Sequence, residues 1–287
     1  MINCTVKIMN KDFKKLIEDK NKEIKDEYKG CCSVSKLCND YIKIKFDDVA
    51  TAERCAKKGL EDPNYKYAGM TAEQILEQWH AKADESKRYG SLLDDYAGMR
   101  LNQEDDKLEM WKLDNAYEYD ERLNANCKGF DEFYEFISTK TNYKYVAREL
   151  PLYCKTNKGG LINGRFDCLF YDENTDAFII IDWKTTDDIT TSSAYHKKLQ
   201  GPAYMLDECD MNTYTIQLHV YKKALVETYG LSSYDKISVY VCNMLKHPGE
   251  DGKYYKLFKQ NFDFDLNKLN AFIDFGHNKH KLLKNLK

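Results

Sequence analysis

Two charged side chains stand at the end of an apolar, strand-like run. Residues 178–181, FIII, have the composition of a buried strand and lead directly into Asp182, Trp183 and Lys184. Side chains alternate between the two faces of a strand, so Asp182 and Lys184 share one face while Trp183 points to the other. Burying an unpaired charge is costly, so this pattern indicates an ion pair, a metal ligand or a catalytic group.

A second carboxylate precedes a neighbouring strand-like run. Asp167 ends the segment GRFD at residues 164–167 and leads into the apolar residues 168–171. Residues 172–176, DENTD, are polar and turn-prone, which predicts that the two runs form an antiparallel hairpin. Such a hairpin would bring Asp167 beside Asp182.

The elements that must position these groups are expected in the order helix, three strands, helix, strand. Their expected ranges are a helix over 131–140, strands over 143–153, after the glycine turn at 158–160, and through the hairpin, a helix over 214–229, strands over 236–245 and 254–262, and a helix over 266–286. This order predicts an α/β fold with a mixed central β-sheet flanked by helices.

The N-terminal third has a helical pattern throughout. Expected helices cover the first 30 residues and residues 35–45, 47–58, 71–96 and 106–124. Thr71 and the polar residues after it are typical of a helix N-cap. We expect a helical N-terminal region over residues 1–84, packed on a core domain over residues 85–287.

Composition excludes several classes of protein. A chain of 287 residues can bury a hydrophobic core without the support of disulfide bonds or structural metals. No apolar run approaches the roughly 20 residues that a membrane span needs. The first residues lack the apolar core of a signal peptide, so we expect a cytoplasmic protein with no membrane partner. Ten scattered cysteines contain no C-x2-C pair, which favours reduced structural thiols over a metal or iron-sulfur site.

Charge is unevenly distributed along the chain. The net charge of −3 gives no global basic character, and acidic residues crowd the first half. Lys197-Lys198, Lys222-Lys223 and the C-terminal residues are locally basic. A polyanion would therefore bind to a patch rather than to the whole surface.

Three motifs in this order resemble the PD-(D/E)xK nucleases, and within them the RecB-like group that includes phage and viral DNA exonucleases. Residues 164–167 match G-x-x-D, residues 182–184 match (D/E)-x-K, and residues 217–221, QLHVY, match Q-x-x-x-Y. The resemblance covers about residues 85 to 245. It implies a restriction-endonuclease-like core in the order α-β-β-β-α-β, with the N-terminal helices as an extension.

The resemblance also implies a metal site. Asp167, Asp182 and the backbone carbonyl of Trp183 correspond to metal ligands, and Asp94 in Gly90-Ser91-Leu92-Leu93-Asp94 stands where many relatives have the histidine of G-T-x-x-H. Oxygen ligands suit one or two Mg²⁺ or Mn²⁺ ions, so aspartate is chemically tolerable there, although Asp95 follows directly. Glu149 resembles a glutamate found on the preceding strand in this family.

Phosphodiester hydrolysis explains why these residue types would occur together. A divalent ion clamps phosphate oxygens and makes water nucleophilic, while Lys184 would orient or deprotonate that water and offset charge. Gln217 and Tyr221 lie four residues apart on one helix face, so both would face the site, Gln217 as a hydrogen-bonding group and Tyr221 against a phosphate or a base. DNA would also contact Arg165, Lys197 and Lys198.

The function implied is a metal-dependent deoxyribonuclease, acting from DNA ends in recombination, repair or genome processing. Two alternatives stay open: a structure-specific endonuclease or nickase using the same site, and an inactive DNA-binding or assembly protein. RNA also stays open as a substrate, because no feature of the sequence indicates whether the site distinguishes ribose, with its 2′-hydroxyl, from deoxyribose. Expected partners are DNA and either a second copy of the chain or a viral or phage recombination protein in the host cytoplasm.

Overall fold

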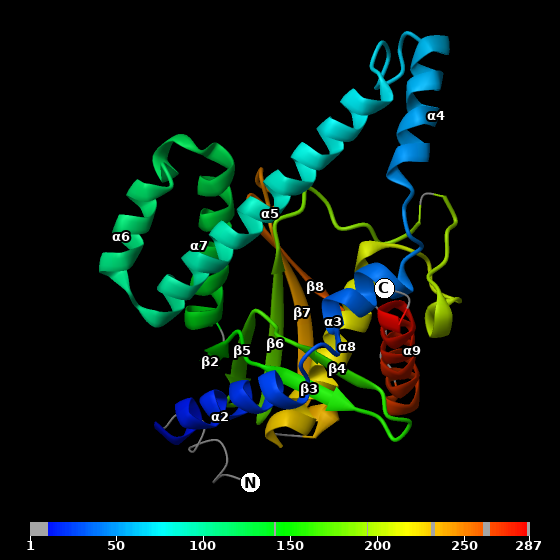
Figure 1. Ribbon diagram of the computed structural model, residues 1–287. Coiled ribbons are helices and arrows are strands. Elements are labelled where there is room, and N and C mark those ends of the chain that lie inside the picture. The colour runs from blue at the N-terminus through cyan, green and yellow to red at the C-terminus, as the bar shows by residue number, and fades with distance from the viewer. Residues whose placement is uncertain (1–10, 141, 194, 231–232, 261–264, 286–287) are drawn as a thin grey trace.

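The computed structural model of the protein describes residues 11–140, 142–193, 195–230, 233–260 and 265–285 (Figure 1). Its α-helices are α2 (Lys11–Glu27), α3 (Val34–Lys36), α4 (Asp48–Glu61), α5 (Ala72–Asn102), α6 (Asp105–Asp114), α7 (Glu121–Lys140), α8 (Asp210–Tyr229) and α9 (Leu266–Asn285). The same described residues also contain a π-helical segment, η1 (Leu37–Ile42), and three short 3₁₀ turns, Tyr117–Tyr119, Gly201–Ala203 and Tyr234–Lys236. Its strands are β1 (Cys32–Ser33), β2 (Tyr143–Arg148), β3 (Leu152–Lys155), β4 (Leu161–Gly164), β5 (Cys168–Asp172), β6 (Ala177–Lys184), β7 (Ile237–Met244) and β8 (Tyr255–Lys259).

The strands form two mixed sheets. The larger sheet has the order β2-β5-β6-β7-β8, in which β6 and β7 are parallel and the other neighbours are antiparallel. The smaller sheet has the order β1-β4-β3, with β1 parallel to β4. The mixed α/β architecture predicted from the sequence is confirmed, with two sheets in place of one.

Helices cover both faces of the larger sheet. Helix α7 packs against β2, β7 and β8, and α8 packs against β6 and β7. Alternate residues of β6 divide between two cores: Ile179, Ile181 and Trp183 belong to the core under α5 and α7, whereas Phe178 and Ile180 belong to the core under α8. Strand β6 is therefore buried on both faces, as its apolar sequence predicts.

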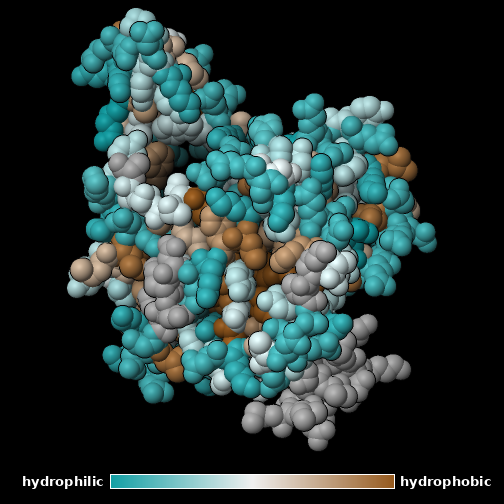
Figure 2. All heavy atoms as spheres, turned by 180° about the vertical axis from the view of Figure 1, so that it is seen from behind, coloured by the Kyte–Doolittle hydropathy of each residue, from teal (hydrophilic) through white to brown (hydrophobic). Residues whose placement is uncertain are grey.

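Helix α5 spans the molecule. Its first half lies beside α4 and projects with it as an arm, while its second half crosses above the larger sheet beside α7 (Figure 1). The arm has only a small core of its own, Ala52, Tyr67 and Ile75, and its surface is largely hydrophilic in Figure 2. Because α5 runs unbroken through residue 84, the division of the chain at that residue falls inside a helix and stays a prediction.

The segment predicted to be one strand forms two strands that belong to different sheets. The sequence predicts a strand over 143–153, but β2 ends at Arg148 and β3 begins at Leu152. Glu149 adopts a left-handed conformation with φ of 50°, and Pro151 follows two residues later, so the chain turns between the sheets. The turn places Arg148 and Glu149 at the edge where β5 begins.

Two expected helix boundaries are also wrong. The predicted helix over 106–124 is interrupted after α6, and α7 begins at Glu121, ten residues before the predicted start. Gly129 lies inside α7, where a Cβ atom would come within 2.3 Å of the Tyr254 carbonyl oxygen. This glycine serves close packing against the chain before β8 and does not end a helix.

The remaining elements follow the expected order. Helices α4, α5, α8 and α9 and strands β4 to β8 lie close to the predicted positions, although α8 begins four residues early at Asp210 and α5 continues six residues past its predicted end, to Asn102. The predicted helix over 35–45 is short and largely π-helical, and the predictions for residues 1–10, 261–262 and 286 fall outside the described residues. In the described part of the chain, no helix is both long and apolar enough to span a membrane.

Candidate active site

Strands β5 and β6 separate at the point where the carboxylates begin. Their last register pair is Cys168 with Ile181, so the backbone of Trp183 has no partner on β5. The carboxylate of Asp167 takes that place, accepting a hydrogen bond from the Trp183 backbone N–H at 2.7 Å. The hairpin thus brings Asp167 to the end of β6, as the turn-prone DENTD sequence predicts.

Asp182 and Lys184 share the α8 face of β6. The Lys184 ammonium donates to Asp182 Oδ2, and the Asp182 side chain is 4% exposed. Trp183 points the other way and packs edge-on against Phe130 of α7, with 5.5 Å between ring centroids. The predicted division of these three side chains between the faces is confirmed.

Lys184 is held as a cation. Burial alone would lower its pKa, but the carboxylates of Asp182 and Asp167 raise it above its ordinary value. The ammonium also lies 5.1 Å from the ring centroid of Tyr214 on α8, and burial raises the pKa of that phenol to about 12. The arrangement favours a protonated lysine beside a neutral phenol.

Asp94 reaches the same region from α5. Its Oδ2 accepts a hydrogen bond from Arg148 Nη2 at 2.5 Å, and its Oδ1 is buried without a hydrogen-bond partner among the described residues. Asp95, the alternative at this position, is exposed. Asp94 is therefore the residue of this pair that faces the other carboxylates.

Burial and neighbouring carboxylates raise the pKa of two acidic side chains of the site, Asp167 and Glu149. Burial raises the pKa of Asp167 well above its ordinary value, and the charges of Asp182 and Asp94 raise it further, against the lowering effect of Lys184. Burial, Asp94 and Asp182 likewise raise the pKa of Glu149. Both carboxylates are therefore harder to ionise than in water, and a bound cation would favour their charged forms.

The crowded carboxylates fit a divalent ion in donor type. One oxygen of each is engaged by a protein donor: Asp94 by Arg148, Asp167 by the Trp183 N–H, and Asp182 by Lys184. The buried, unpartnered Oδ1 of Asp94 is an oxygen left for a ligand. Within the described ranges, however, no group of three His, Cys, Asp or Glu side chains lies close enough together to bind a metal ion without rearrangement.

A model of the PD-(D/E)XK nuclease superfamily matches residues 61–263, which include all of these groups. The chain belongs to the PD-(D/E)XK nuclease superfamily. It also aligns with a crystal structure from Eubacterium rectale named "Putative exonuclease", at 17% identity and a TM-score of 0.40, over 85% of this chain and 87% of that one. No curated protein matches the sequence.

Membership confirms the fold predicted from the three motifs and makes the chain a nuclease. PD-(D/E)XK nucleases generally use divalent metal ions, in keeping with the oxygen-rich site at the end of β6. The order of elements that the superfamily requires is present as α7, β2, β5, β6, α8 and β7. The smaller sheet and the α4–α5 arm are additions around that core.

The Q-x-x-x-Y pair lies on α8 above the strand β4. Gln217 Nε2 donates to the Tyr221 hydroxyl at 3.0 Å, so the two side chains do share one helix face. The Tyr221 ring is 2% exposed and packs against Phe166, which leaves no ring face for a stacked base. Gly164 explains this packing, since a Cβ there would lie 2.8 Å from Tyr221 Cε1.

The other expected DNA contacts lie farther out. Arg165 is exposed and approaches Glu149 to 3.9 Å. Lys197 and Lys198 are exposed on the segment between β6 and α8, and Lys198 is paired with Asp207 at 2.7 Å. Arg165 is therefore the one of these three cations that lies beside a carboxylate of the site.

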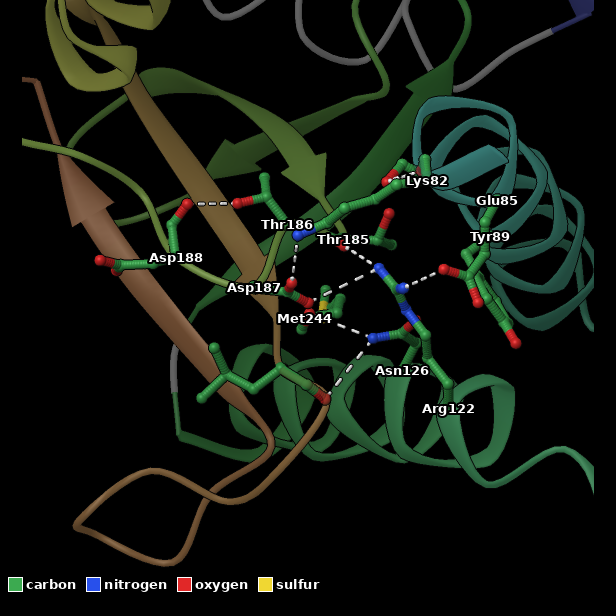
Figure 3. A network of polar contacts seen from close by, with 12 residues as sticks. Lys82, Glu85, Tyr89, Arg122, Asn126, Thr185, Thr186, Asp187, Asp188 and Met244 are labelled. Atoms are coloured by element: carbon green, nitrogen blue, oxygen red, sulfur yellow. Dashed lines mark hydrogen bonds and ion pairs between the residues drawn. The ribbon is translucent and has the colours of Figure 1, made fainter. Parts of the chain in front are cut away.

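A network missed from the sequence ties the nuclease site to its supporting helices (Figure 3). Arg122 of α7 donates to the carbonyl oxygen of Thr185 at 3.1 Å, directly after Lys184. Its guanidinium also lies over the Tyr89 ring of α5 at 4.5 Å and pairs with Glu85 at 3.4 Å. Arg122 thus joins α5, which carries Asp94, to the exit of β6.

A second support lies on β7. Asn243 is buried beside Lys184, and its side-chain amide accepts the Thr186 N–H at 3.2 Å and donates to the Thr186 carbonyl at 3.1 Å. The buried amide thus pairs both backbone groups of Thr186, which follows the end of β6, in place of a neighbouring strand. No sequence motif indicates Arg122 or Asn243. The sequence does contain one sign of close packing on α5, because Gly98 lies one turn after Asp94 and a glycine inside a helix allows another group to approach the backbone.

The described cysteines form no disulfide bonds. Burial raises the pKa of the Cys168 thiol, which follows Asp167 directly. Cys38 of η1 lies within electrostatic range of Asp182 and Lys184, with burial raising its thiol pKa to about 12. Cys38 is therefore a neutral thiol beside the charged pair at the end of β6.

Proposed function

We propose that this nuclease is a Mg²⁺- or Mn²⁺-dependent deoxyribonuclease of the RecB-like group, acting from DNA ends in recombination, repair or genome processing. The observation that carries the proposal is the convergence of Asp167, Asp182 and Lys184 at the open end of β6, with Asp94 facing them from α5. The Q-x-x-x-Y pair on α8 supports the RecB-like assignment. Its expected partners are DNA and either a second copy of the chain or a phage recombination protein.

Each residue has a distinct part in the proposed reaction. Asp94, Asp167, Asp182 and the Trp183 carbonyl would hold the metal, which supplies positive charge beside the scissile phosphate and favours ionisation of the attacking water. Lys184, kept protonated by Asp182 and Asp167, orients that water and offsets charge on the phosphate. Gln217 holds the Tyr221 hydroxyl and so fixes the α8 surface that faces the site.

A cleavage assay with matched variants tests the proposal. End-labelled linear DNA and the same DNA as a closed circle are incubated with Mg²⁺, Mn²⁺ or a chelator, using wild type, Asp182→Asn and Lys184→Met. We expect metal-dependent loss of the linear substrate by wild type and none by either variant, with circular dichroism spectra unchanged. Full activity in either variant contradicts the assigned site.

The same assay separates the alternatives. Cutting of the closed circle would establish the endonuclease or nickase, because a strict exonuclease needs an end. Binding of DNA without consumption in Mn²⁺ would establish the inactive binding protein. A labelled RNA of the same sequence decides between DNA and RNA as substrate.

A further inference from the structure

The two oxygens of Asp94 have different surroundings. Oδ2 accepts one hydrogen bond from Arg148 Nη2 at 2.5 Å, whereas Oδ1 is buried and unpartnered among the described residues. A guanidinium that serves only to neutralise a carboxylate commonly binds both oxygens through two parallel hydrogen bonds. Here a single contact fixes the carboxylate and leaves its second oxygen unused.

The fold makes room for this contact. Arg148 is the last residue of β2 and pairs with Cys168, next to Asp167, so its side chain crosses from the sheet edge to α5. Gly98 lies one turn after Asp94 on α5, and a Cβ there would lie 1.7 Å from Arg148 Nη1 and 2.7 Å from its Cζ. The guanidinium therefore occupies the space of a missing side chain, directly beside Asp94.

The Arg148 side chain is itself enclosed. It is 21% exposed, and its Nε is buried without a partner among the described residues. An arginine whose main task was stability would be expected to satisfy that nitrogen as well. In the described part of the chain, its guanidinium donates a hydrogen bond to Asp94 and to no other side chain.

We propose that Arg148 is a positioning residue for metal binding: it holds Oδ2 of Asp94 so that Oδ1 is presented to the divalent ion. This inference rests on the proposed metal site. Ligating carboxylates in proteins are usually fixed by a hydrogen bond to the oxygen that does not bind the metal, and losing such a partner costs about 10-fold to 100-fold in metal affinity. The opposite role, a cation that competes with the metal for Asp94, predicts tighter binding when Arg148 is removed.

Mn²⁺ binding without nucleic acid distinguishes these roles. Free Mn²⁺ is measured by electron paramagnetic resonance during titration of the full chain, for wild type, Arg148→Met, Arg148→Lys and Gly98→Ala. We expect the dissociation constant to rise about 10-fold to 100-fold in Arg148→Met, and less in Arg148→Lys, which keeps one donor. Gly98→Ala keeps the charge but displaces the guanidinium, so it should weaken binding too.

Two controls make each outcome decisive. Arg100→Met removes an arginine of α5 that pairs with Asp131 at 2.9 Å, outside the site, and it should leave Mn²⁺ affinity unchanged. Asp182→Asn should abolish binding, and if wild type binds no Mn²⁺ or Asp182→Asn binds it equally, the metal site itself is wrong. If Asp182→Asn loses binding while Arg148→Met and Gly98→Ala bind as wild type or more tightly, only the role of Arg148 is overturned.

Discussion

The carboxylate of Asp167 accepts the backbone N–H of Trp183 at 2.7 Å, where β5 has already parted from β6. A side chain thus replaces a strand partner at the residue between Asp182 and Lys184. This hydrogen bond gives the backbone at the end of β6 a partner where β5 no longer supplies one. The same carboxylate carries a raised pKa, because burial and Asp182 disfavour its charge.

These two roles of Asp167 can be separated by substitution. Asp167→Asn keeps an oxygen acceptor for the Trp183 N–H but removes the charge, so metal-dependent cleavage should fall more than about 100-fold, beyond the usual cost of losing an outer-shell partner. Its melting temperature without metal should match or exceed that of wild type. Asp167→Ala leaves the N–H unpaired and should also cost about 1–3 kcal/mol of unfolding free energy. Equal stability of the two variants would contradict the structural role.

Arg122 offers a test of how the site is supported. Arg122→Lys keeps the charge but cannot reach both Glu85 and the Thr185 carbonyl, so we expect a loss of about 1–3 kcal/mol in urea unfolding and reduced cleavage. Arg88→Lys is a matched control, since the side chain of Arg88 is 53% exposed, and it should change stability by less than about 0.5 kcal/mol. Similar losses in both variants would show that Arg122 has no special role.

Local patterns made part of this structure predictable. The β5–β6 hairpin and the division of Asp182 and Trp183 between two faces depend on alternation within about twenty residues, which the sequence displays directly. The parallel pairing of β6 with β7 follows from the intervening helix α8. The four-residue spacing of Gln217 and Tyr221 likewise predicted that the two side chains share one helix face.

Long-range packing was not predictable in the same way. Gly129 has the local signature of a helix boundary, yet its real constraint is the Tyr254 backbone, more than a hundred residues away. Likewise, Gly98 is explained only by Arg148, which arrives from another element, and β1 is too short to leave a pattern. The sequence contains the residues of these contacts, but not the tertiary arrangement that pairs them.

Asp120 caps the N-terminus of helix α7, and its contribution to stability depends on pH. Its carboxylate caps α7 through the Leu123 N–H at 2.9 Å and accepts the Tyr89 hydroxyl of α5 at 2.9 Å. Burial raises its pKa, but these hydrogen bonds and Arg88 prevail and lower it below its ordinary value. The carboxylate therefore contributes stability above its unfolded pKa near 4, and that contribution is lost as pH falls through the lower folded pKa.

Asp120→Asn removes this titration while keeping a good N-cap residue. Between pH 6 and pH 2.5, as assay conditions, the wild-type unfolding free energy should drop by about 1 kcal/mol more than that of Asp120→Asn, the difference between charged and neutral hydrogen bonds. Urea unfolding at both pH values measures this. An equal drop in the two proteins would mean that Asp120 does not titrate with folding.

Gly164→Ala tests whether the glycine of the G-x-x-D motif serves packing. The added methyl group would lie 2.8 Å from Tyr221 Cε1 and 3.0 Å from Val34 Cγ2, so the Tyr221 ring must move and its hydrogen bond to Gln217 should break. We expect a loss of about 1–3 kcal/mol in unfolding free energy, together with reduced cleavage. Gly90→Ala is the matched control, because its methyl group meets only Thr185 Oγ1 at 4.0 Å on a helix that favours alanine. If both substitutions are equally tolerated, Tyr221 is free to shift, and the close approach at Gly164 does not constrain the nuclease site.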